Sequence, residues 1–170
     1  KSINIGQFEE LRRRKIQAYY KDNSVFMTNH QVDESDMMDD IVHEIAHAVE
    51  EKYEELIYSD GLIEDEFVKK RMQLWNLLKI RGFEQNMQFF LDPNYSERFD
   101  EYLHKTVGYP TMRILTPSIF YSPYAATSIR EYFANGFEAF YLQAETHKIR
   151  KISPVLYKKL ENLLKDEDRT

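Results

Sequence analysis

The chain has 170 residues, a formal net charge of −6 and no cysteine. The length fits one domain with a sizeable core, and the missing cysteine excludes disulfides, thiol chemistry and cysteine-based zinc sites. The acidic balance and the hydrophobic fraction of 42% exclude an extended nucleic-acid surface and general disorder, and no apolar run is long enough to span a membrane.

Helices dominate the elements that the hydrophobic pattern predicts. Apolar spacing and capping residues predict helices over 7–21, about 35–57, 64–80, 95–107 and about 125–148, and a last helix that begins at Pro154. One strand is predicted at Ser24 to Thr28, as an edge of a small twisted sheet. The segment from Gly108 to Tyr124 holds three prolines and is predicted to be irregular. The fold class is therefore α+β and predominantly α-helical.

The most informative segment is the His-Glu-x-x-His motif at positions 43–47, which lies inside a helical pattern. A spacing of four residues places His43 and His47 one turn apart on the same face, where both imidazoles can reach one zinc ion. Glu44 then lies beside the metal, where it can take a proton from the attacking water and pass it to a leaving amine. The alternative is an ordinary amphipathic helix with two core histidines, each of which would need polar partners.

A catalytic zinc site of this kind needs a third protein ligand and an open fourth position. The third histidine of the extended motif is missing, because Tyr53 stands six residues after His47. Glu131 is the better candidate: its predicted helix is apolar on most sides, so the carboxylate needs a partner inside the protein, unless it lies on a solvated face. Asn135 could accept a hydrogen bond from the outer nitrogen of a ligating histidine, and Glu138 is the rival for that role.

Two segments together resemble a known family: HEIAHAVE and, further along, SPYAATSIREYFANGFEAFY. They are similar to the zinc metalloprotease domain of the anthrax lethal factor type, a gluzincin group whose relatives include the bacterial Pro-Pro endopeptidases. In that family the Glu of the second helix is the third zinc ligand, which implies this role for Glu131. A Tyr seven residues before that Glu lies near the zinc and acts on the oxyanion or the leaving group, which implies a catalytic role for Tyr124. The family often has a carboxylate where Asn135 stands.

The resemblance implies a single zincin-like catalytic domain over residues 1–170. Glu131 follows His47 by 84 residues (131 − 47), so a helical insertion is expected at about 60–107. The predicted function is that of a zinc metalloendopeptidase with one Zn2+ per chain and a peptide or protein as substrate. Secretion is implied by the resemblance alone, and neither the compartment nor the cleavage specificity follows from the sequence.

Two alternative functions stay open at this point. One is a non-catalytic or zinc-stabilised module of a larger assembly, such as a toxin subunit or a phage particle component. In that case Glu138 or His104 would close the zinc site as a fourth ligand. A start at Lys1 rather than Met fits such a piece of a larger polypeptide. The other alternative is a metal-free helical interaction protein with a coincidental motif.

Overall fold

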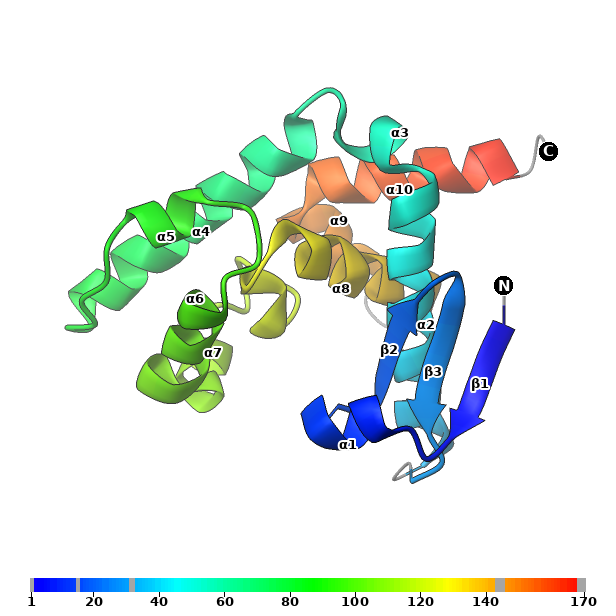
Figure 1. The fold of residues 1–170 in the computed structure, drawn as a ribbon. Coiled ribbons are helices and arrows are strands. Elements are labelled where there is room, and N and C mark those ends of the chain that lie inside the picture. Colours follow the sequence, from blue (N-terminus) through cyan, green and yellow to red (C-terminus); the bar gives the residue numbers. More distant parts are fainter. Residues whose placement is uncertain (1, 15, 31–32, 143–145, 168–170) are drawn as a thin grey trace. The chain divides into compact units, whose positions relative to one another are not determined.

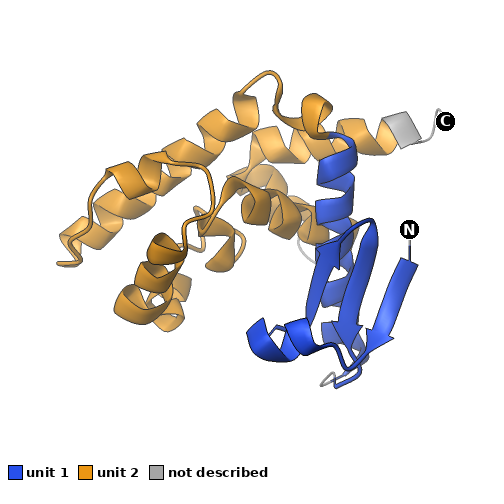
Figure 2. Ribbon diagram, viewed as in Figure 1, with its two compact units in different colours: residues 1–53 blue, residues 54–170 orange. Residues whose placement is uncertain are grey.

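The fold comes from a computed structural model, which describes residues 2–14, 16–30, 33–142 and 146–167. Within these ranges the chain is mostly helical and carries one small sheet, which confirms the α+β class. The finer zincin-like assignment stays a prediction. The chain divides into two compact units, residues 1–53 and residues 54–170 (Figure 2). No described helix is both long and apolar enough to cross a bilayer.

Unit 1, residues 1–53, contains a three-stranded sheet with the strand order β1-β3-β2 (Figure 1). Strand β1 (Ser2–Gly6) runs parallel to β3 (Ser24–Thr28), with Ile3 opposite Val25. Strand β2 (Ala18–Lys21) runs antiparallel to β3 on its other side. The strand predicted from the sequence is therefore confirmed, but its predicted place at an edge is wrong. It is the central strand, because β1 and β2 satisfy its backbone groups on both sides.

A two-residue turn joins β2 to β3. Asp22 and Asn23 have φ values of 50° and 61°, the left-handed conformation that a type I′ hairpin turn requires and that Asp and Asn tolerate well. The helix predicted over 7–21 is wrong in its second half, because this hairpin begins there. Among the described residues of this range, only those of α1 (Glu9–Arg14) are helical.

Helix α2 (Glu34–Lys52) is the long helix of unit 1 and packs against β2 and β3. Its N-cap is Asp33, whose carboxylate accepts hydrogen bonds from the backbone N–H groups of Ser35 and Asp36 at 2.8 and 2.9 Å. Asp33 is therefore the capping residue, and the helix begins at Glu34, close to the predicted start at about residue 35. The helix also ends earlier than the predicted end near Ile57.

Unit 2, residues 54–170, is helical throughout its described elements. These are α3 (Glu54–Tyr58), α4 (Leu62–Ile80), α5 (Gln88–Leu91), α6 (Glu97–Glu101), the π-helical η1 (Tyr102–Val107), α7 (Tyr109–Leu115), the 3-10 turn η2 (Tyr124–Ala126), α8 (Ile129–Tyr141), α9 (Thr146–Ile152) and α10 (Pro154–Glu167). Helix α8 contacts α4, α9 and α10 and lies in the middle of the unit (Figure 1). The predicted start of the last helix at Pro154 is confirmed.

The segment between Gly108 and Tyr124 is more regular than predicted. Helix α7 forms there because Pro110 stands in its first turn, where a missing backbone N–H removes no intrahelical hydrogen bond. The prolines further along do coincide with a change to turns, which end in the short η2 segment.

The long helix predicted over about 125–148 is divided in the structure. Helix α8 begins after Ser128, whose hydroxyl accepts a hydrogen bond from the backbone N–H of Glu131 at 3.2 Å. The helix ends at Tyr141, and α9 follows as a separate element. Residues 143–145 lie outside the described residues.

Helix α8 is held at the centre of unit 2 by close packing. The ring of Tyr132 lies 5.4 Å from that of Phe67 and 6.0 Å from that of Phe120, measured between centroids, and all three side chains are buried. One turn further on, Gly136 faces α10. A Cβ atom at this position would lie only 2.3 Å from Cδ2 of Leu156, so the missing side chain allows the two helices to approach closely.

Candidate metal centre

The two motif histidines lie as the sequence predicts, one turn apart on α2. The ring centroids of His43 and His47 are 5.2 Å apart, with the ring planes at 84°, and both side chains are half-buried. Two imidazoles at this separation can each offer one nitrogen to the same ion. Glu44 is also half-buried and follows His43 directly, about 100° further round the helix, beside the face that carries the histidines.

Glu50 is a neighbour of the histidines that the sequence analysis missed. Its side chain is buried, with 3% exposed, and its Oε2 atom lies 3.4 Å from Nδ1 of His47. A carboxylate at Nδ1 favours the tautomer that carries its proton there, which leaves Nε2 with a lone pair for a metal. The available signal was the spacing of three residues on a helix, which brings the two side chains together.

Glu131, the candidate third ligand, lies in the first turn of α8 in unit 2. Its side chain is half-buried, and its backbone N–H is fixed by the capping residue Ser128. The N-terminal turn of a helix favours a negatively charged side chain, so a carboxylate is well tolerated here. The position of Glu131 is thus set by the cap that begins the helix.

Asn135 connects Glu131 to the segment before the helix. Its Nδ2 donates to the backbone carbonyl of Glu131 at 2.9 Å, and its Oδ1 accepts from the hydroxyl of Ser122 at 2.5 Å. These two bonds tie the chain just before Tyr124 to α8. The role predicted for Asn135 toward a ligating histidine stays a prediction, as does that of its rival Glu138, which is half-buried on the same helix.

Tyr124 begins the η2 turn, and 37% of its side chain is exposed. Burial of the hydroxyl and then the negative charge of Glu131 raise the pKa of this phenol far above its usual value. The phenol is therefore protonated at neutral pH and can donate a hydrogen bond. Because the charge of Glu131 raises this pKa, Tyr124 and Glu131 lie in one electrostatic environment within unit 2. These are the two residues whose roles the family resemblance implies.

Further polar residues share this environment, and the sequence analysis did not find them. The hydroxyl of Tyr95 donates to Oδ2 of Asp100 at 3.0 Å. Burial and the charge of Asp100 raise the pKa of Tyr109, and the charges of Asp100 and Tyr109 also raise that of Tyr124. These residues come from separate elements before α8, so no local motif links them to Glu131.

His104, one of the two candidates for a fourth ligand in the structural-zinc alternative, lies in η1. Its side chain is exposed, and its ring centroid is 5.1 Å from that of Tyr109. A ring tilted by 34° against a neighbouring phenol is an ordinary environment for a surface histidine. The contacts described for His104 therefore do not support a role as fourth zinc ligand.

Comparisons with protein-family models, with curated proteins and with solved structures found no match to this chain. The resemblance to the lethal factor family therefore rests on the two quoted motifs alone and stays a prediction.

Proposed function

We propose that this chain is a zinc-dependent metalloendopeptidase in which His43, His47 and Glu131 hold one zinc ion. The observation that carries the proposal is the histidine pair of α2, with its rings 5.2 Å apart and a buried carboxylate at Nδ1 of His47. Glu131, in the first turn of α8 in unit 2, would complete this ligand set as the family resemblance implies. Two imidazoles, one carboxylate and an open fourth position are a ligand set typical of catalytic zinc.

Each proposed role follows from the chemistry of the side chain. A zinc ion in this site would polarise the scissile carbonyl and increase the acidity of water. Glu44 takes the proton of the attacking water and delivers it to the leaving amine. Tyr124 stays protonated and donates a hydrogen bond to the carbonyl oxygen as negative charge develops there. The substrate is a peptide or protein.

The test of this function is cleavage of a quenched fluorescent peptide library by the zinc-loaded chain. Glu44→Gln is expected to lower kcat/KM by about 10³-fold while zinc stays bound, since general acid–base catalysis contributes about 10²–10⁴-fold. Glu34→Gln is the matched control, because it makes the same change at an exposed position of the same helix. Unchanged cleavage by Glu44→Gln with zinc bound would overturn the proposal.

A second variant separates catalysis from a purely structural zinc. Tyr124→Phe removes only the hydroxyl and is expected to lower kcat by about 10²-fold with little change in KM, as for the loss of one oxyanion donor. Zinc content should not change. A purely structural zinc would have no open ligand position, so a hydroxamate would not bind to it.

A further inference from the structure

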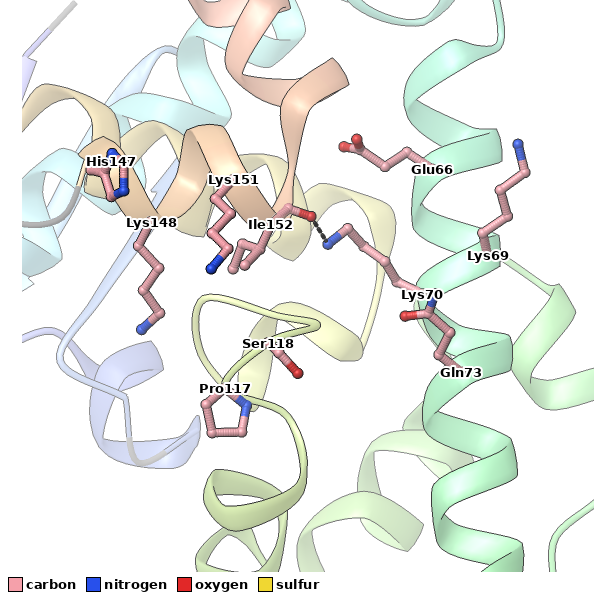
Figure 3. A pocket seen from close by; sticks show the side chains of 10 residues that line it. All are labelled: Glu66, Lys69, Lys70, Gln73, Pro117, Ser118, His147, Lys148, Lys151 and Ile152. Carbon is pink, nitrogen blue, oxygen red and sulfur yellow. Dashed lines mark hydrogen bonds between the residues drawn. The ribbon is translucent and has the colours of Figure 1, made fainter.

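A pocket of about 630 Å³ lies within unit 2, between α4, α9 and the chain that follows α7 (Figure 3). Its walls carry four lysines and one glutamate, namely Lys69, Lys70, Lys148, Lys151 and Glu66. Figure 3 shows Lys69 pointing from α4 away from the space between α4 and α9, so the side chains that face this space carry a formal charge of +2 (3 − 1), although the whole chain carries −6. Positive charge is therefore concentrated in one cavity of an acidic protein, where it raises the local concentration of anions.

The one carboxylate of the pocket is already bound elsewhere. Glu66 accepts hydrogen bonds from the hydroxyl of Tyr132 at 2.7 Å and from the backbone N–H groups of Val155 and Leu156 at 2.9 and 3.2 Å. Its negative charge therefore lies at the first turn of α10, where it stabilises the helix N-terminus, and Figure 3 shows the carboxylate turned toward that side.

Lys70 brings a buried cation to the pocket. Only 6% of this residue is exposed, and its Nζ donates to the backbone carbonyls of Ile119 and Ile152, both at 2.5 Å. Burial lowers the pKa of Lys70 to about 8, and the charge of Glu66 offsets only part of that effect. Two of the three N–H donors of the ammonium are occupied by carbonyls, which fix its position at the wall.

The lysines of α9 extend toward the same space. Figure 3 shows Lys148 and Lys151 reaching from α9 toward the loop that carries Pro117 and Ser118, while Lys70 reaches across from α4. The Nζ atom of Lys148 lies 5.0 Å from the ring centroid of Tyr121. Ammonium groups therefore approach the cavity from two elements, and Ser118 adds a hydroxyl donor to the lining.

We propose that this pocket binds a small soluble molecule that bears a phosphate or diphosphate group. The volume lies within the range of small-molecule sites, about 300–1,000 Å³. Several lysines around one cavity suit a multiply charged anion, because each ammonium acts as a point charge on a phosphate oxygen. This inference does not depend on the proposed zinc site, since it uses other residues and other chemistry.

The test is calorimetric titration of the full chain with sodium pyrophosphate at physiological ionic strength. The wild type is expected to show saturable binding to one site. Lys148→Glu and Lys151→Glu are each expected to weaken it by about tenfold or more, the loss expected when a charge-assisted hydrogen bond is replaced by repulsion. Lys165→Glu makes the same charge change at an exposed position of α10, outside the pocket lining, and should change the affinity by less than about twofold.

Two results would overturn the proposal. One is the absence of saturable pyrophosphate binding by the wild type. The other is an equal loss of affinity in Lys165→Glu, which would show that only the overall charge matters. Circular dichroism and a thermal melt of each variant establish that it is folded, and pyrophosphate at one fixed concentration should raise the melting temperature of the wild type more than that of Lys151→Glu.

Discussion

Gly136 allows α8 and α10 to pack closely, so Gly136→Ala is expected to destabilise unit 2. A Cβ atom there would lie 2.3 Å from Cδ2 of Leu156 and 3.2 Å from Cδ1 of Ile149. The first distance is far below van der Waals contact, and both neighbours are fully buried. Relief would need the buried Leu156 side chain to move within the core, or a shift of α8 itself, the helix that carries the candidate ligand Glu131.

Two opposing effects determine the size of the change. Alanine is favoured over glycine inside a helix by about 1 kcal/mol. Extra volume in a packed core costs about 1–3 kcal/mol, and a contact of 2.3 Å belongs at the upper end of that range. The free energy of unfolding should therefore fall by about 2 kcal/mol, the difference between the two effects.

Urea unfolding followed by Trp75 fluorescence measures this change, because Trp75 is the one tryptophan of the chain and lies on α4 in unit 2. The matched background is Leu156→Ala, which removes the clashing methyl groups. In that background Gly136→Ala should cost little or stabilise by up to about 1 kcal/mol. An equal loss in both backgrounds, or no loss in the wild type, would refute the packing argument.

Three further predictions concern single side chains. The pKa of Lys70 is about 8 in the folded protein, against 10.5 for an ordinary exposed lysine. The unfolded state therefore binds more protons than the folded state between these two pH values. The free energy of unfolding should then rise by about 2 kcal/mol from pH 8 to 10, and urea titrations of Lys70→Met should lack this rise. Glu66→Gln leaves one N–H of α10 without its carboxylate partner and should cost about 2 kcal/mol in the same assay, whereas Glu64→Gln, at an exposed site, should cost nothing measurable. Glu50→Gln weakens the orientation of His47 and should lower zinc affinity by about tenfold in a chelator competition, with an unchanged melting temperature of the metal-free chain as the control.

The parts of the fold that could be predicted are those with a local signal. Helix α4 has a long apolar stripe and lies close to its predicted bounds, and α10 has Pro154 in its first position and begins there as predicted. Strand β2 was missed although Asp22 and Asn23 mark a hairpin turn, because the preceding residues also fit a helical spacing. Strand β1 pairs in parallel with a strand 22 residues away (24 − 2), and no local pattern shows such a partner.

The residues of the candidate site also differ in how well the sequence alone predicts them. His43 and His47 are one helical turn apart, so their spacing alone predicts a shared face with Glu44 beside it. Glu131 comes from a distant helix and could be selected only through the apolar character of that helix and a family resemblance. The contribution of Asp100 to the surroundings of Tyr124 depends on tertiary packing, which spacing along the chain does not reveal.

The most direct test of the account is the zinc content of the purified, reconstituted chain, measured by elemental mass spectrometry. The account predicts about one zinc ion per wild-type chain and clear loss of zinc in Glu131→Gln. Glu138→Gln, the same change two turns further along α8, should retain the metal. A wild-type chain without zinc, or full retention of zinc by Glu131→Gln, would contradict the proposed centre.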